Sequence, residues 1–179
     1  MLKRRAVDTE QIYLIKTIRQ DMDSGQLLAQ EGWFLLVDVF RVLSPGDPGP
    51  YKLAFKQIQK IVNKGQDPFD VMGHKKVGGR VFVLMERFAP WYLGNPLFRL
   101  RKLPAEYPFE SFIRLTKGSF RLSEVCKGYE DRLPFSYNSI KRLVDQTPQS
   151  RKNMGVYKFD KTYILEMPAF ARWFGNQLI

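Results

Sequence analysis

Residues 72–91 read MGHKKVGGRVFVLMERFAPW, and residues 154–173 read MGVYKFDKTYILEMPAFARW. The second stretch repeats Met72-Gly73 as Met154-Gly155, at an offset of 82 residues (154 minus 72). At that offset four further pairs match, namely Met85 with Met167, Phe88 with Phe170, Ala89 with Ala171 and Trp91 with Trp173. Because the matched residues are mainly apolar and keep their order, we interpret them as core positions of a duplicated unit.

The match extends upstream of these stretches. The same offset pairs Ile58 with Ile140, Val62 with Val144 and Lys76 with Lys158. Still further upstream the offset becomes 86, pairing Phe34 with Phe120, Val39 with Val125 and Tyr51 with Tyr137, so the first copy has a few extra residues between Tyr51 and Ile58. Chance similarity between two basic, aromatic-rich segments is the alternative. The duplication predicts two modules, 31–93 and 118–179.

The segments outside the modules have their own signals. Asp8 can cap a helix whose third residue is Gln11, and apolar residues recur at helical spacing up to Met22. We therefore expect an N-terminal helix within residues 1–30, ending near Ser24-Gly25. Residues 94–117 include the basic run Arg99-Leu100-Arg101-Lys102 between Pro and Gly residues, and they are rich in large apolar side chains. This composition predicts a basic, ordered connector.

Each module begins with an apolar segment and continues with a helix. In the first copy, residues 32–43 fit a strand or a short helix, and residues 44–50 form a turn rich in Pro and Gly. From Lys52 to Lys64 the pattern is helical, with a core stripe of Ala54, Ile58, Ile61 and Val62 and a stripe of lysines every four residues. The second copy repeats this plan with Ile140, Leu143 and Val144 facing inward.

A hairpin and a short helix close each module. Gly78-Gly79 lies between two alternating segments and supplies the positive φ that a tight hairpin turn needs, and Asp160-Lys161 occupies the same place in the second copy. The residues at i, i+3 and i+4 that follow, beginning at Met85 and Met167, predict closing helices with core contacts. The fold class expected is α+β, with two similar modules of helices plus a small hairpin.

Composition points to a folded protein with an anionic partner. Hydrophobic residues make up 44% of the chain and aromatic residues 14%, which is too rich in core-forming side chains for a disordered chain. The 29 Lys and Arg exceed the 18 Asp and Glu and give a formal net charge of +11. Such a positive potential favours nucleic acid as the partner, and an anionic membrane surface is the second candidate. The partner that we expect is double-stranded DNA, and no membrane partner is expected.

Other features bear on the compartment. Cys126 is the single cysteine, which excludes an intrachain disulfide and favours a reducing compartment. No stretch has the apolar length of a signal peptide or a membrane span. We therefore expect a cytoplasmic protein.

The segment Val77-Gly78-Gly79-Arg80-Val81-Phe82-Val83 through Trp91 resembles the small winged-helix domains of the MerR and phage-excisionase kind. In those domains a recognition helix is followed by a hairpin wing and then by a helix that ends in an aromatic residue. The second copy matches less well, because it lacks the Gly pair. The resemblance implies tandem winged-helix modules of the helix-turn-helix class that act in transcription regulation, DNA recombination or replication.

The candidate DNA-binding residues lie on the predicted helices and hairpins. A helix fits the major groove of DNA, where cationic side chains meet phosphates or guanine and amide side chains can read adenine. In the first copy the candidates are Lys52, Lys56, Gln57, Lys60, Lys64, Lys75, Lys76 and Arg80. In the second copy they are Asn138, Lys141, Arg142, Lys158 and Lys161. The simpler alternative for these residues is a solvated helix face and a structural hairpin.

Catalysis has little support in the sequence. His74 is the only histidine and Cys126 the only cysteine, so neither a zinc site built from them nor a Cys/His dyad is expected, and we predict no cofactor. The rival to DNA binding is a protein-interaction adaptor, in which exposed Trp91, Tyr92 and Phe98 would anchor a protein partner or a second copy. Salt dependence separates the two functions, because only phosphate-driven binding weakens steeply with salt.

Overall fold

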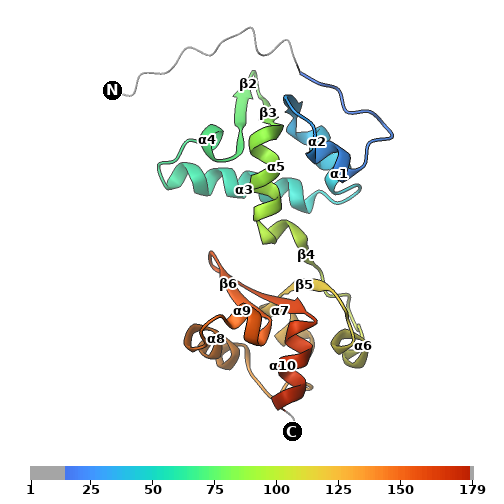
Figure 1. The fold of residues 1–179 in the computed structure, drawn as a ribbon, viewed down its shortest axis with the longest axis vertical. Helices are drawn as coiled ribbons and strands as arrows, with labels where there is room; N and C mark the ends of the chain where they lie inside the picture. Colours follow the sequence, from blue (N-terminus) through green and yellow to red (C-terminus); the bar gives the residue numbers. More distant parts are fainter. Residues whose placement is uncertain (1–14, 178–179) are drawn as a thin grey trace. The chain divides into compact units, whose positions relative to one another are not determined.

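A computed structural model describes residues 15–177, and these form helices and two small sheets, so the predicted α+β class is confirmed. The chain divides into two compact units, Met1–Phe98 and Arg99–Ile179. We call them unit 1 and unit 2 and describe each by itself (Figure 1). Residues 1–14, including the predicted cap Asp8, lie outside the described part of the chain.

Unit 1 contains one sheet and five α-helices within its described residues. In chain order the elements are α1 (Ser24–Leu28), β1 (Trp33–Leu35), α2 (Leu36–Leu43), α3 (Gly49–Asn63), α4 (Pro68–Met72), β2 (His74–Val77), β3 (Arg80–Leu84), α5 (Met85–Gly94) and the 3-10 helix η2 (Pro96–Arg99). The strand order is β1-β3-β2, and both pairings are antiparallel. The apolar segment 32–43 is therefore a strand that runs directly into a helix.

Unit 2 repeats this order. Its elements are β4 (Leu100–Arg101), α6 (Phe109–Ile113), β5 (Gly118–Arg121), α7 (Leu122–Gly128), α8 (Tyr137–Gln146), α9 (Ser150–Met154), β6 (Val156–Phe159), β7 (Thr162–Met167) and α10 (Ala169–Gln177). The strand order is β4-β5-β7-β6. In both units a strand, three helices, a hairpin and a closing helix follow one another (Figure 1).

The equivalence of the two units begins before the predicted modules. In unit 2, β4 pairs with β5 in parallel, and Leu100 lies opposite Ser119. In unit 1, Ile15 forms a parallel bridge to Trp33, which precedes Ser119 by the same offset of 86. A short helix follows in each unit, α1 in one and α6 in the other. The segment expected to be a connector is thus folded as the beginning of unit 2.

The predicted N-terminal helix is wrong over the described residues 15–22. Instead of continuing a helix, the Lys16 backbone N–H donates to the Trp33 carbonyl oxygen at 2.9 Å, which ties this segment to β1. Helix α1 starts at Ser24, where the predicted helix was to end, and Asp23 caps it. Asp23 and Gln26 form a capping box, the same Asp-x-x-Gln pattern that suggested a helix start at Asp8.

The hairpin turns are those the sequence predicts. Gly78 and Gly79 have φ of 55° and 80°, which places both in the left-handed region required by a two-residue turn. In unit 2 the turn is Asp160-Lys161, with Asp160 at a φ of 53°. The register follows from these turns, because Val77 lies opposite Arg80 and Phe159 lies opposite Thr162.

Each unit has its own hydrophobic core. Phe34, Val39 and Phe88 are buried in unit 1, and Phe120, Val125 and Phe170 occupy the matching positions in unit 2. Trp91 packs on Phe88 at 5.6 Å between ring centroids, and Trp173 packs on Phe170 at 5.7 Å. The matched aromatic residues are therefore core contacts, as the duplication predicts.

Three core predictions need correction. Val62 is 49% exposed, although Ile58 and Ile61 on the same helix are buried, so the apolar stripe of α3 is narrower than predicted. Leu143 is 36% exposed on α8, where Ile140 and Val144 face the core. Met167 is buried, but it is the last residue of β7, and α10 starts two residues later.

Within residues 15–177 no helix has the length and apolar character needed to span a bilayer.

Candidate nucleic-acid interface

The lysines of α3 occupy the side of the helix opposite the core. Ala54, Ile58 and Ile61 are buried, and each residue turns an α-helix by about 100°, so Lys52, Lys56 and Lys60 point away from the core. These three lysines and Lys64 are exposed. Among the described residues, no carboxylate lies within ion-pair distance of Lys52, Lys56 or Lys64. The predicted lysines are therefore exposed on this side of the chain, and Gln57 is half-buried beside them.

The hairpin of unit 1 places its cations on two different faces. Lys75 and Lys76 are adjacent on β2 and so point to opposite sides of the sheet. The Lys75 Nζ lies 5.4 Å from the centre of the Trp33 ring, which holds it against β1. Lys76 lies opposite Val81, on the sheet face that carries the core. Lys75 and Lys76 thus point to different faces of the hairpin, and Lys76 and Arg80 are exposed on either side of the turn.

Helix α8 exposes a different set of side chains. Asn138 and Arg142 lie one turn apart on its solvent side, and Ser136 caps the helix by accepting the Ser139 backbone N–H at 3.2 Å. Arg142 occupies the position of Lys60, and Asn138 that of Lys56, at the offset of 82. The hairpin adds Lys161, which is exposed at the turn.

Tyr163 connects α8 to the hairpin of unit 2. Its ring is buried, and its hydroxyl donates to the two carboxylate oxygens of Asp145 on α8, at 3.0 and 3.2 Å. The Nζ atoms of Lys141 and Lys158 lie 5.5 and 5.7 Å from the centre of this ring. Burial, followed by the hydrogen bond to Asp145, raises the pKa of Tyr163, so the hydroxyl stays protonated and keeps donating at neutral pH. The structure therefore brings together two predicted site residues, Lys141 and Lys158, at a tyrosine that joins helix and hairpin.

Sequence reasoning did not identify Tyr163, Tyr137 or Asp145 as part of this group. The signal was present, because a two-residue turn at Asp160-Lys161 sets Lys158 directly opposite Tyr163. Tyr137 is the first residue of α8, and its ring centre lies 5.5 Å from the Lys141 Nζ. The Tyr137 and Tyr163 rings also make an edge contact, with 6.3 Å between their centres. The contact of Asp145 with Tyr163 depends on how α8 packs on the hairpin, which sequence periodicity does not specify.

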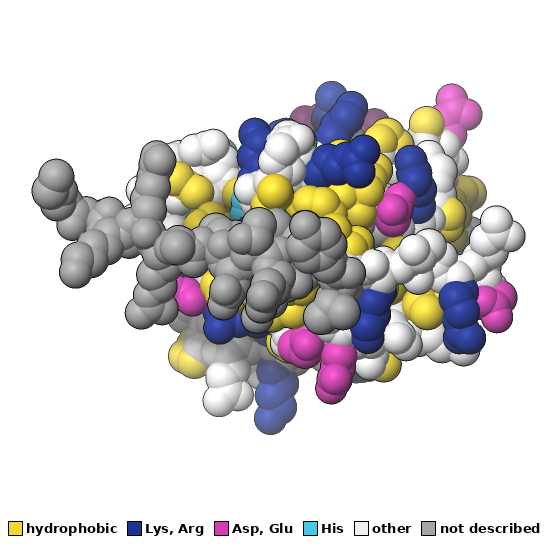
Figure 2. Space-filling model, turned by 90° about the horizontal axis from the view of Figure 1, so that it is seen from above, with side chains coloured by type: hydrophobic (Ala, Val, Ile, Leu, Met, Phe, Trp, Pro, Cys, Tyr) yellow, Lys and Arg dark blue, Asp and Glu magenta, His cyan; other side chains and the backbone are white. Residues whose placement is uncertain are grey.

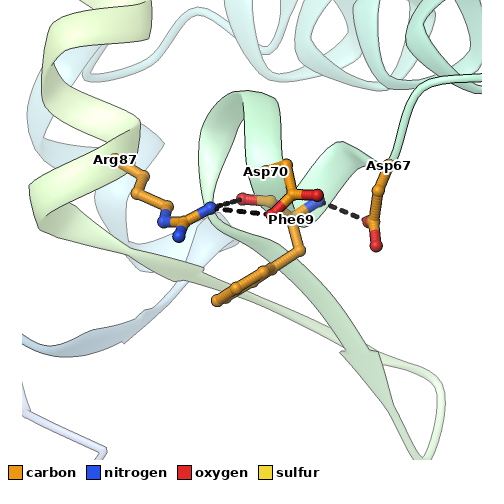
Figure 3. A network of polar contacts seen from close by, with 4 residues as sticks. All are labelled: Asp67, Phe69, Asp70 and Arg87. Carbon is orange, nitrogen blue, oxygen red and sulfur yellow. Dashed lines mark hydrogen bonds and ion pairs between the residues drawn. The ribbon is translucent and has the colours of Figure 1, made fainter. Parts of the chain in front are cut away.

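Other cations of unit 1 are engaged in structural contacts. The Arg87 Nη1 donates to the Phe69 carbonyl oxygen and to the Asp70 carboxylate, both at 3.1 Å, and the guanidinium lies 4.5 Å from the Phe69 ring centre (Figure 3). Asp67 caps α4 through the Phe69 backbone N–H at 2.8 Å. This network fastens α4 to α5, so Arg87 belongs to the scaffold.

Unit 2 has a comparable network on the sheet face that carries Tyr157 and Glu166. The Arg151 guanidinium donates to both carboxylate oxygens of Glu166, at 2.8 and 2.9 Å, and lies 4.5 Å from the Tyr157 ring centre. The Tyr157 hydroxyl also donates to Glu166, at 3.0 Å. Burial and the neighbouring Glu166 raise the pKa of Tyr157 to about 12. Tyr157 precedes Lys158 on β6, so this network lies on the hairpin face opposite Tyr163.

Positive charge is not confined to one unbroken patch. Figure 2 views the molecule from the upper end of Figure 1, and it shows Lys and Arg side chains in several separate groups with hydrophobic and acidic side chains between them.

The single histidine and the single cysteine are both shielded from solvent, His74 partly and Cys126 almost fully. His74 is half-buried, and burial lowers its pKa. Burial also raises the pKa of the Cys126 thiol to about 11, so the thiol is protonated and a weak nucleophile at neutral pH. Within residues 15–177, no three His, Cys, Asp or Glu side chains gather as a metal site would need.

The aromatic anchors of the adaptor alternative are not exposed as that function requires. Phe98 is buried, and its ring lies 5.2 Å from Trp91 and 4.9 Å from Tyr92. Trp91 and Tyr92 are half-buried against the core of unit 1. These three residues therefore stabilise unit 1 and offer little surface to a partner.

Comparisons with known proteins give no relative: no family model, no curated protein and no solved structure matches this chain.

Proposed function

We propose that this protein binds double-stranded DNA through two tandem winged-helix modules, with α3 and α8 as the groove-facing helices and the β2–β3 and β6–β7 hairpins as the wings. The observation that carries the proposal is the repetition of one element order in both units: a helix with an exposed polar or cationic face is followed along the chain by a hairpin that bears lysine. Lys60 and Arg142 are equivalent at the offset of 82, and so are Lys76 and Lys158. At the offset of 82, these are the two candidate positions that carry a positive charge in both copies.

The chemistry of the exposed groups suits DNA. Lysine ammonium groups spaced one turn apart on α3 can meet successive phosphates, and release of the counterions condensed on DNA drives such binding. Arg142 can donate two parallel hydrogen bonds to the O6 and N7 of guanine, and Asn138 can pair with adenine in a similar way. Two modules on one chain bind more tightly than either alone, since the first contact raises the effective concentration of the second. Such a protein would serve as a transcriptional regulator or as an accessory factor in recombination or replication.

The first test measures binding of the full chain to random-sequence duplex DNA over a range of salt concentrations. We expect the logarithm of the affinity to fall linearly with the logarithm of salt, with a slope of about −0.9 for each phosphate contacted. Slopes of several units indicate phosphate-driven binding. A slope near zero, or no binding at low salt, contradicts the proposal.

Charge-reversal variants locate the surface. In Lys56→Glu/Lys60→Glu we expect an affinity loss of tenfold or more at physiological salt and a smaller slope, because phosphates would meet carboxylates. The control is Lys102→Glu/Lys127→Glu, which changes net charge equally at exposed lysines outside the helices and hairpins proposed to bind. If both double variants lose the same affinity, binding follows net charge alone and α3 is not an interface. Selection of duplexes from a random pool with the wild-type chain then supplies a preferred sequence, if there is one.

A further inference from the structure

The two units differ in how the proposed groove-facing helix is tied to its hairpin. In unit 2, Asp145 near the end of α8 accepts the Tyr163 hydroxyl of β7, and β6 packs against α8. Lys141 of α8 and Lys158 of β6 both lie over the Tyr163 ring. The Asp145–Tyr163 hydrogen bond and the Lys141–Tyr163 cation–π contact therefore tie α8 to the hairpin, whereas the Lys158–Tyr163 contact lies within the hairpin.

Unit 1 has different residues at these positions. Val81 replaces Tyr163 at the offset of 82, and Asn63 replaces Asp145. The Asn63 side-chain oxygen accepts from the Gln59 amide at 2.9 Å, so its hydrogen bond stays within α3. Lys75 of the hairpin lies over Trp33 of β1 rather than over a residue of α3. The polar tie of unit 2 thus has no counterpart at the equivalent described positions of unit 1.

The exposed side chains of α3 and α8 also differ, in a way that matches the difference in how each helix is tied to its hairpin. α3 presents Lys52, Lys56 and Lys60, and Lys64 follows directly after it; these lysines carry compact charges on flexible stems. Such groups bind phosphates without a strict geometry. α8 presents Asn138 and Arg142, whose planar groups form paired hydrogen bonds only at a defined distance and angle. A planar group reads a base edge only if the element that carries it is held in place.

From these differences we propose that unit 2 reads the DNA sequence, with Arg142 as a specificity-determining residue and Tyr163 as a positioning residue, while unit 1 supplies sequence-independent affinity through the lysines of α3. This division of labour rests on the proposed DNA binding. It requires that affinity and sequence discrimination respond to different substitutions.

The experiment uses the full chain and two duplexes of equal length, the preferred one from selection and a scrambled version of the same composition. The quantity measured is the discrimination ratio, which is the dissociation constant for the scrambled duplex divided by that for the preferred duplex at one salt concentration. We expect Arg142→Lys to reduce this ratio at least fivefold with an unchanged salt slope, because the charge stays and the paired hydrogen bonds are lost. Lys56→Ala should weaken both duplexes by the same factor and leave the ratio unchanged.

Tyr163→Phe tests the positioning role, with a matched control on the same hairpin. The variant keeps the ring and removes the hydroxyl that reaches Asp145, and we expect the ratio to fall severalfold while binding of the scrambled duplex stays within twofold of wild type. The control Tyr157→Phe removes a hydroxyl that donates to Glu166 on the opposite face of the hairpin, and it should leave the ratio intact. If Tyr163→Phe does not fold, Asp145→Ala breaks the same bond from the exposed side of α8.

The outcomes separate this inference from the function on which it rests. No binding of either duplex overturns the proposed function itself. Binding with a wild-type ratio near one, or a ratio that Arg142→Lys and Tyr163→Phe leave unchanged, overturns the division of labour and leaves DNA binding intact. A ratio that falls in Lys56→Ala as much as in Arg142→Lys also overturns it, because α3 would then read sequence too.

Discussion

Gly73 and Gly155 end equivalent helices, α4 and α9, with φ of 69° and 67°. A Cβ at Gly155 would lie 2.3 Å from the Phe170 backbone nitrogen, so an L side chain there is both strained and in collision. A left-handed conformation alone costs an L residue roughly 1–2 kcal/mol. Because of the added collision, we expect Gly155→Ala to lower the free energy of unfolding by more than this amount. Urea unfolding followed by circular dichroism measures this loss.

The control for Gly155 lies in the same unit. Gly175 is within α10, and a Cβ there meets nothing within 4 Å. Gly175→Ala should leave stability unchanged or raise it by up to about 1 kcal/mol, since alanine favours a helix. If Gly155→Ala and Gly175→Ala lower the free energy of unfolding equally, the collision at Gly155 does not destabilise the fold and the prediction is wrong.

His74 gives the stability of unit 1 a pH dependence. Burial is the main cause that lowers its pKa below the usual value of about 6.5, although Asp67 opposes the shift. The unfolded chain therefore binds a proton at a higher pH than the folded chain does, and stability falls as the pH drops through and below about 6.5. We expect the urea midpoint of wild type to fall from pH 7.5 to pH 5.5, and His74→Gln to reduce that fall. An identical fall in the variant would assign the pH dependence to other groups.

At the scale of elements, the cap of α8 offers a direct test of local stability. Ser136 accepts the Ser139 backbone N–H, and its loss leaves that donor without its cap. Ser136→Ala should cost about 1 kcal/mol in urea unfolding. Ser123→Ala, an exposed serine within α7, is the control and should change stability by less than about 0.5 kcal/mol. A similar cost for both would indicate that the Ser136 hydroxyl is not a cap.

Elements whose signals are local could be predicted from the sequence. The hairpin turns follow from Gly78-Gly79, and the core side of α3 follows from the spacing of Ala54, Ile58 and Ile61. The segment before α1 could not be predicted, because its apolar spacing fits a helix and the β-bridge that Ile15 forms depends on the distant Trp33. Among site residues, the lysine stripe of α3 was predictable, whereas the contact of Asp145 with Tyr163 depends on packing between α8 and β7.

At the scale of the whole molecule, the unit boundaries predict which fragment folds. Residues 99–179 contain a complete core, including Phe112 of α6, which is fully buried. We expect this fragment to fold alone, with dispersed amide resonances and a cooperative thermal transition. Residues 118–179 lack β4 and α6, so they should have a markedly lower melting temperature or no transition. Equal stability of the two fragments would mean that the segment before Gly118 is not part of the unit.

In the strand orders of the described residues, β2 is an edge strand of the sheet in unit 1 and β6 is an edge strand of the sheet in unit 2. An unpaired edge can recruit a strand from another molecule and seed aggregation, and lysine on the edge opposes this through charge repulsion. Lys75, Lys76 and Lys158 lie on these edges. Neutralising them would therefore lower solubility as well as any affinity for DNA, and loss of soluble protein could be mistaken for loss of binding.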